Sequence, residues 1–215
     1  MAENDRQTER DAMVQDQIVA RGVKDEAVLR AMRKVPRHKF VPQEYEQDAY
    51  SDSPLPLGHR QTISQPYIVA FMSEAAQLRP TDKVLEIGTG SAYQTAVLAE
   101  LAKEIYTIEI IDPLGLKAKG LLHELRYENA HVRIGDGYEG WKENAPFDVI
   151  FVTAAPNHIP EPLVEQLKVG GRFIIPVGSE RQELVRIAKT ESGLVQEALL
   201  RVSFVPMTGA AKEQK

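Results

Sequence analysis

The sequence predicts one α/β domain in which helices cover both faces of a mostly parallel sheet. Short apolar runs alternate with helix-like segments between residues 83 and 177, a pattern typical of parallel sheets. One run, residues 84–87, leads directly into Gly88-Thr89-Gly90-Ser91. An apolar strand followed by Gly-x-Gly and a helix predicts a tight turn at which a nucleotide-like ligand can approach the backbone.

The N-terminal part of the chain predicts two short helices and an irregular segment. Residues 8–21 are helix-like and end at Gly22, and the apolar spacing of Val28, Ala31 and Met32 predicts a second helix that stops before Pro36. Residues 36–65 contain several prolines and little periodicity, but their apolar side chains favour an ordered lid over a disordered loop.

The remainder predicts the elements of the sheet. Ser64 is expected to cap a helix that begins at Pro66. The expected strands are 83–87, 104–109, 131–134, 147–152 and 172–177, and the expected helices between them are 91–102, 113–126 and 160–167. Residues 183–189 and 194–205 flank a turn at 190–193 and predict a terminal hairpin. We therefore divide one compact domain into residues 1–65, the helical extension and lid, and residues 66–215, the core.

Composition narrows the possible functions. With 215 residues, 43% of them hydrophobic, the chain can form one sizeable core. A formal net charge of −5 gives no general attraction to nucleic acids or anionic membranes, and the lack of cysteine excludes disulfides and thiolate chemistry. The histidines lack metal-ligand spacing, and no membrane span or secretory signal is evident. We expect a cytoplasmic monomer with no metal, nucleic-acid or membrane partner.

The glycine turn and the acidic residues after the strands indicate the ligand. Glu109 ends an apolar run 21 positions after Gly88 and suits the two hydroxyls of a ribose. The third glycine of a dinucleotide-binding G-x-G-x-x-G would fall at position 93, which is Tyr93. S-adenosylmethionine fits better, because it has a ribose and an adenine but no pyrophosphate.

Two further acidic residues belong to this expected site. Asp136, between two glycines, either accepts a hydrogen bond from an adenine amino group or stabilises its own turn. Glu86 is expected to anchor backbone amides around the glycine loop rather than to touch the ribose.

Several motifs together resemble those of the protein-L-isoaspartate O-methyltransferase family. The similarity runs from Met13 to Gly209, and Gln61-Thr62-Ile63-Ser64-Gln65-Pro66-Tyr67 is its most diagnostic part, because generic methyltransferases lack it. The other matching motifs are Val35-Pro36-Arg37-His38-Lys39-Phe40-Val41-Pro42, the glycine loop, Gly135-Asp136-Gly137, Val152-Thr153-Ala154-Ala155-Pro156 and Val205-Pro206-Met207-Thr208-Gly209.

The resemblance implies a fold and an activity. The fold is that of class I S-adenosylmethionine-dependent methyltransferases: Rossmann-like and doubly wound, with a seven-stranded, mostly parallel sheet and here a short N-terminal helical extension. The activity is methyl transfer from S-adenosylmethionine to the free carboxylate of L-isoaspartyl residues in damaged proteins and peptides, with D-aspartyl residues as a second candidate acceptor. S-adenosylhomocysteine is the other product, and the ester begins repair through a succinimide.

The resemblance also implies roles for single residues. Ser64 matches the active-site serine that holds the substrate carboxylate. The other substrate contacts are expected at Ile63, Val205 and Pro206. The expected cofactor-binding residues are Glu86, Gly88, Gly90, Ser91, Glu109, Asp136, Gly137 and Thr208. Without the resemblance, a plain helix cap is the favoured interpretation of Ser64; with it, capping and substrate binding are compatible.

Two departures from the family pattern leave alternatives open. The family often has glycine where this chain has Arg60 and Ala92. Ala92 would be strained at a positive φ, although we expect it to be tolerated. Arg60 either attracts a carboxylate substrate or is a solvated lid residue. A methyltransferase for a small-molecule carboxylic acid and a non-catalytic S-adenosylmethionine-binding module remain alternative functions.

Overall fold

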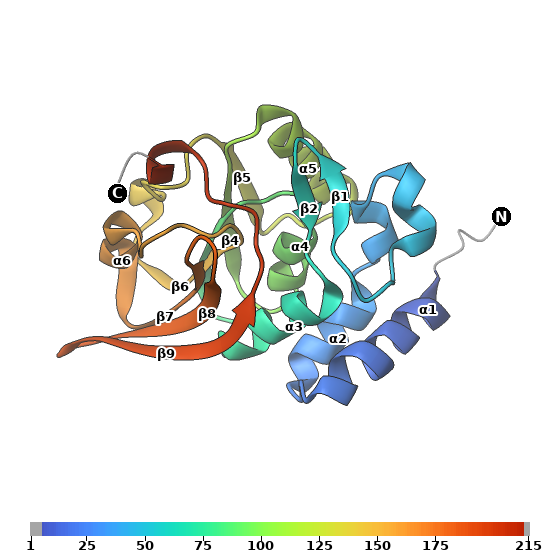
Figure 1. Ribbon diagram of the computed structural model, residues 1–215, viewed down its shortest axis with the longest axis horizontal. Coiled ribbons are helices and arrows are strands. Elements are labelled where there is room, and N and C mark those ends of the chain that lie inside the picture. Colours follow the sequence, from blue (N-terminus) through green and yellow to red (C-terminus); the bar gives the residue numbers. More distant parts are fainter. Residues whose placement is uncertain (1–5, 213–215) are drawn as a thin grey trace.

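The computed structural model describes residues 6–212, which form a seven-stranded sheet flanked by helices (Figure 1). The strand order is β5-β4-β3-β6-β7-β8-β9. The strands are β3 (Lys83–Ile87), β4 (Glu104–Glu109), β5 (Ala130–Ile134), β6 (Phe147–Val152), β7 (Leu167–Val177), β8 (Gln182–Thr190) and β9 (Gly193–Val202). Strands β3 to β7 pair in parallel, whereas β8 pairs antiparallel with both β7 and β9. The predicted mostly parallel sheet and terminal hairpin are confirmed.

The sheet is buried on both faces. Side chains alternate along a strand, so Val84 of β3 packs in one hydrophobic cluster and its neighbour Leu85 in another. The first cluster includes side chains of α3 (Pro66–Ala75) and α4 (Tyr93–Ala99), and the second includes Leu163 of α6 (Glu161–Gln166). The remaining core helix is α5 (Asp112–Glu124), which packs along β4 and β5.

Several boundaries differ from the predictions. Helix α4 ends at Ala99 instead of at residue 102, and α5 spans Asp112–Glu124 instead of residues 113–126. Helix α4 begins at Tyr93 rather than at residue 91, because Ala92 has a left-handed φ of 68° that no helical position allows. Helix α6 ends at Gln166, and β7 begins at once with Leu167 instead of at residue 172.

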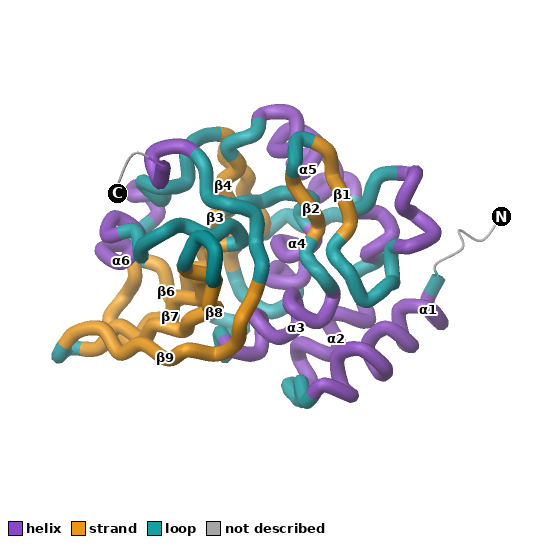
Figure 2. Tube along the Cα trace, viewed as in Figure 1, coloured by secondary structure: helices purple, strands orange, loops and turns teal. Residues whose placement is uncertain are grey.

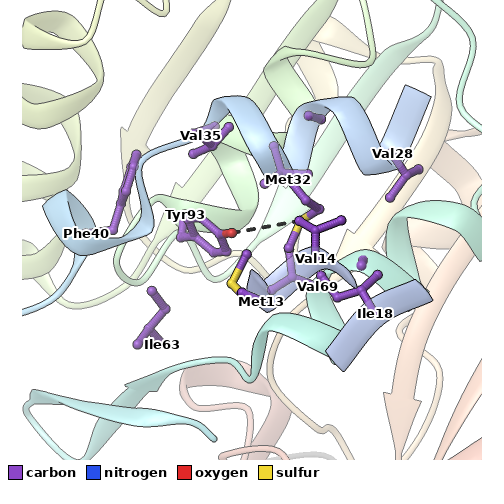
Figure 3. Close-up of a cluster of buried hydrophobic side chains, with 14 of the residues drawn as sticks. Met13, Val14, Ile18, Val28, Met32, Val35, Phe40, Ile63, Val69 and Tyr93 are labelled. Atoms are coloured by element: carbon purple, nitrogen blue, oxygen red, sulfur yellow. Dashed lines mark hydrogen bonds between the residues drawn. The ribbon is translucent and has the colours of Figure 1, made fainter. Parts of the chain in front are cut away.

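The N-terminal helices share their core with the helices of the sheet. Residues 7–21 form one helical run made of α1 (Gln7–Ala12), a π-helical turn η1 (Met13–Ile18) and a 3₁₀ turn η2 (Val19–Arg21). Helix α2 (Glu26–Lys34) is capped by the Asp25 carboxylate. Figure 3 shows Met13 and Met32 from these helices gathered around Tyr93 of α4. The predicted division into residues 1–65 and 66–215 stays a prediction. Its outer ends, residues 1–5 and 213–215, lie outside the described range.

The segment between α2 and α3 has more regular structure than the sequence suggested. It contains two 3₁₀ helices, η3 (Arg37–Phe40) and η4 (Gln43–Asp48), and a hairpin of β1 (Leu55–Gly58) and β2 (Gln61–Ile63). In Figure 2 this hairpin stands apart from the main sheet. Its buried ends, Leu55 and Ile63, pair with each other and belong to the same hydrophobic cluster as Tyr93, so the hairpin is fixed to the core at one end.

Candidate active site

A cavity of about 820 Å³, including the space open to solvent, lies at the carboxyl ends of the central strands. The chain leaves β3 toward β4 on one side of the sheet and leaves β6 toward β7 on the other, and ligands of open α/β sheets bind at such a reversal. All predicted site residues except Glu86 line this cavity. They are Ile63, Ser64, Gly88, Gly90, Ser91, Glu109, Asp136, Gly137, Val205, Pro206 and Thr208.

The glycine loop is held in a conformation that favours glycine. Gly88 has a φ of 96° and Gly90 a φ of 53°, in the left-handed region where a Cβ is unfavourable. Thr153, directly after β6, donates its hydroxyl to the carbonyl oxygens of Gly88 (2.6 Å) and Ile87 (3.0 Å). A Cβ at Gly88 would collide with the same hydroxyl. The loop therefore presents bare backbone to the cavity.

Glu109 fixes the other side of this loop. Its Oε2 accepts a hydrogen bond of 2.8 Å from the Gly90 N–H, and its Oε1 accepts one of 2.9 Å from the Ile111 N–H. The side chain is buried, yet the residue lines the cavity. Each carboxylate oxygen has a second lone pair, which leaves acceptors for hydroxyl groups of a ligand.

The expectation that Glu86 anchors backbone amides is wrong. Its Oε2 accepts hydrogen bonds from the hydroxyls of Thr95 (2.5 Å) and Thr107 (2.7 Å), and its Oε1 has no partner among the described residues. Alternation along β3 turns Glu86 toward α4 and away from the cavity. Complete burial raises its pKa to about 7, whereas the amide-anchoring role belongs to Glu109.

Asp136 stabilises its own turn and also holds the C-terminal segment. Its Oδ1 accepts from the Tyr138 N–H (2.9 Å) and its Oδ2 from the Ala210 N–H (2.8 Å). The same segment, red in Figure 1, is bound to the loop after β6 by the hydrogen bonds Ala155 N–H to Val205 O (2.8 Å) and Met207 N–H to Ala155 O (2.9 Å). The C-terminal segment is thereby fastened along one wall of the cavity. The adenine contact of Asp136 stays a prediction.

Ser64 lies between β2 and α3, and the expectation that it caps α3 is wrong. The capping position belongs to Gln65, whose side chain makes no capping hydrogen bond and binds Asp52 instead. The preceding residue, Ile63, is buried in the hydrophobic cluster (Figure 3). Because no hydrogen bond within residues 6–212 engages the half-buried Ser64 hydroxyl, it is available to a ligand.

Both departures from the family pattern occupy left-handed backbone. Arg60 has a φ of 59° and Ala92 a φ of 68°. Ala92 is buried, whereas Arg60 is exposed in the turn between β1 and β2 and does not line the cavity. The structure therefore favours the interpretation of Arg60 as a solvated lid residue.

Some lining residues were given no role in the predicted site, although several of them belong to the matching motifs. They are Gln61, Thr62, Val69, Ile87, Thr89, Tyr93, Gln94, Ile108, Ile110, Ile111, Thr153, Ala154 and Met207. The most informative is Thr153. Its place in the site could have been predicted, because it directly follows a predicted parallel strand at the carboxyl edge of the sheet. The hydrophobic lining residues resemble ordinary core positions in sequence and carry no such signal.

Between residues 6 and 212, no group of three or more His, Asp or Glu side chains is placed to hold a metal ion. None of the helices there has the length and apolar character that crossing a membrane requires.

The chain is similar to known proteins over almost its whole length. Residues 8–212 match the family described as protein-L-isoaspartate(D-aspartate) O-methyltransferase. A protein-L-isoaspartate O-methyltransferase of a Picosynechococcus strain is 54% identical over 200 residues, which cover 93% of this chain and 90% of the relative. One from Gloeobacter violaceus is 56% identical over 198 residues, covering 91% and 97% respectively.

Two solved structures match the chain in fold and point to the same family. A protein-L-isoaspartate O-methyltransferase structure matches with a TM-score of 0.85 and 31% identity, covering 94% of this chain and 66% of that one. A Plasmodium falciparum structure, described as a protein-L-isoaspartate O-methyltransferase in complex with S-adenosyl-L-homocysteine, matches with a TM-score of 0.81 and 25% identity, covering 93% and 98%. The class I methyltransferase fold is confirmed.

Proposed function

We propose that this chain, which belongs to the protein-L-isoaspartate(D-aspartate) O-methyltransferase family, transfers a methyl group from S-adenosylmethionine to the free carboxylate of L-isoaspartyl residues in damaged proteins and peptides. The products are a methyl ester and S-adenosylhomocysteine, and the ester begins repair through a succinimide. The observation that carries the proposal is the meeting of the glycine loop, Glu109 and Ser64 in one cavity.

The residues at the donor end fit S-adenosylmethionine. Gly88 and Gly90 leave the loop open to close approach, and Glu109 offers carboxylate lone pairs for the ribose hydroxyls. Asp136, Gly137 and Thr208 are assigned to the adenine end and the wall beside it. Among the described residues that line the cavity there is no Lys, Arg or His, which fits a ligand that carries no phosphate.

The acceptor needs little activation. An α-carboxyl group has a pKa of about 3.3 to 3.7 and is ionised at neutral pH, so the reaction requires no general base. The bound donor supplies an electrophilic methyl group on a sulfonium. We assign to Ser64 the task of orienting the acceptor carboxylate through its hydroxyl, with Ile63, Val205 and Pro206 as neighbouring contacts. Since no Lys, Arg or His of residues 6–212 lines the cavity, the carboxylate keeps its electron density for the attack.

The segments around the cavity orient the acceptor and exclude water. The β1–β2 hairpin is anchored through Ile63, and the C-terminal segment is fastened to Asp136 and Ala155. Two fixed walls of this kind limit the approach of the acceptor to one direction and remove competing water.

The role of Ser64 can be tested by Ser64→Ala, with Ser192→Ala in the distant β8–β9 turn as the control. We expect kcat/KM for an isoaspartyl peptide to fall about tenfold or more, because a hydrogen bond to a charged group contributes roughly 1.5 to 3 kcal/mol. Affinity for S-adenosylmethionine, measured by calorimetry, is expected to be unchanged. An equal loss of donor affinity would assign Ser64 a structural role instead.

Assays of methyl transfer to isoaspartyl peptides and of donor binding also separate the alternative functions. A methyltransferase for a small-molecule acid would be insensitive to residues that flank the isoaspartate, and a binding module would bind the donor without transfer. The monomeric state, the cytoplasmic location and activity on D-aspartyl residues stay predictions.

A further inference from the structure

A second cavity adjoins the active site at Ser64. It contains about 980 Å³ of space, part of it open to solvent. It lies between the hairpin of β1 and β2, which we call the lid hairpin, the start of α3 and residues 201–205. Thr62, Ser64, Thr153 and Val205 line both cavities. The second cavity, which we call the flanking groove, therefore begins where the proposed acceptor carboxylate is held.

The flanking groove contains one charged side chain among the described residues, Arg201. The other lining residues are apolar or neutral: Pro54, Thr62, Ser64, Gln65, Ile68, Thr153, Val202, Ser203, Phe204 and Val205. Arg201 is exposed near the end of β9. Glu183 of β8 lies opposite it in the strand pairing, but within residues 6–212 no ion pair joins the two side chains. The guanidinium is thus free to bind a carboxylate.

The backbone on both sides of Arg201 is held in place. Strand pairing fixes Arg201 opposite Glu183. Farther along, the Gln182 side chain donates to the Phe204 carbonyl oxygen (3.0 Å) and accepts from the Phe204 N–H (2.6 Å). A charge on a fixed backbone can discriminate between ligands better than one on a loose loop.

We propose that the flanking groove receives the polypeptide next to the isoaspartyl residue and that Arg201 selects substrates with an acidic side chain there. The inference rests on the proposed function, because an acceptor within a polypeptide must have neighbouring residues outside the central cavity. The groove leads out from Ser64 and supplies space for them. A guanidinium binds a carboxylate through two parallel hydrogen bonds, so Glu or Asp is the complementary side chain.

The test uses isoaspartyl peptides that differ only in one residue, Glu, Gln or Lys, placed immediately before or after the isoaspartate. At one of these two positions, before or after the isoaspartate, we expect kcat/KM for the Glu peptide to exceed that for the Gln peptide about two- to fivefold. This is the size of effect that an exposed ion pair gives. The Lys peptide should be the poorest substrate. The difference should lie mainly in KM and should shrink at high salt.

Two substitutions at position 201 test whether Arg201 causes the preference for Glu. Arg201→Gln should remove the preference for Glu, and Arg201→Lys should retain part of it. Arg79→Gln is the matched control, because it removes an equal charge from an exposed position before β3, at the opposite end of the strands, and should leave the preference intact.

The outcomes separate the two proposals. Transfer to no isoaspartyl peptide would contradict the proposed function itself. Transfer to all three peptides at equal kcat/KM on both sides, or a preference for Glu that persists in Arg201→Gln, would overturn the role of Arg201 and leave the methyltransferase activity standing.

Discussion

The Thr153 hydroxyl donates a hydrogen bond of 2.6 Å to the carbonyl oxygen of Gly88, and a Cβ at Gly88 would occupy the space of that hydroxyl. The loop after β6 therefore holds the loop after the neighbouring strand β3. Because Thr153 also lines the flanking groove, this contact joins the donor end of the active site to the acceptor end.

Gly88→Ala tests this contact. We expect it to lower the free energy of unfolding by about 2 kcal/mol or more, since a left-handed alanine alone costs roughly 1 to 2 kcal/mol. Donor affinity should fall with it. The measurements are denaturant unfolding and calorimetry with S-adenosylhomocysteine.

Gly120→Ala is the control, because Gly120 lies in α5 and a Cβ there meets nothing within 4 Å. It should stabilise the protein by roughly 0.5 to 1 kcal/mol and leave donor binding unchanged. Equal effects of the two variants would contradict a special requirement for glycine at position 88.

Glu109→Gln tests the expected ribose contact. The amide keeps one acceptor oxygen but replaces the other with a donor, which opposes the N–H of either Gly90 or Ile111. We expect donor affinity to fall about tenfold to a hundredfold, the range for a lost hydrogen bond to a charged group. Calorimetry with S-adenosylmethionine measures this change, and an unchanged affinity would remove Glu109 from the donor site.

The buried carboxyl group of Glu86 should make the free energy of unfolding depend on pH. Burial raises its pKa from 4.5 in the unfolded chain to about 7 in the folded one, so the folded state binds more protons between these values. Its contribution to stability is therefore complete below about pH 4.5 and is lost as the pH rises through 7. The loss amounts to an order of 1 to 3 kcal/mol.

The measurement is the free energy of unfolding of the wild type minus that of Glu86→Gln, at intervals between pH 5 and pH 8. Taking the difference cancels the titration of all groups that both proteins share. The difference should decline with rising pH, and a difference that stays flat across this range would mean that Glu86 is already ionised in the folded protein.

Arg60→Gly tests the strain in the lid hairpin. Consecutive residues His59 and Arg60 have φ values of 50° and 59°, a turn conformation that favours glycine. The variant should gain about 1 kcal/mol of stability in denaturant unfolding, and KM for the peptide should be unchanged because Arg60 does not line the cavity. Arg79→Gly, at an exposed position without positive φ, should give no such gain.

Much of the sheet could be predicted because its central strands are short apolar runs with clear ends. The bounds predicted for β3, β4 and β6 match the structure. The lid hairpin could not be predicted, since Pro56 and Gly58 interrupt β1 and the turn residues His59 and Arg60 are not typical turn formers.

The sequence predicted which residues line the cavity where they end a strand or closely follow one. Glu109 and Asp136 both line the cavity as expected. That Glu109 and not Glu86 binds the backbone amides could not be foreseen, because it depends on which face of the sheet each carboxylate occupies and on the distance to particular N–H groups. The position of Ser64 likewise depends on how Ile63 packs against helices that are distant in sequence.

The most direct test of the proposed activity uses two peptides that are identical except for one isoaspartyl or normal aspartyl linkage. It measures the transfer of a labelled methyl group from S-adenosylmethionine to each of them. We predict that label enters the isoaspartyl peptide alone. Equal labelling of both peptides, or labelling of neither while the donor still binds, would contradict the proposed activity.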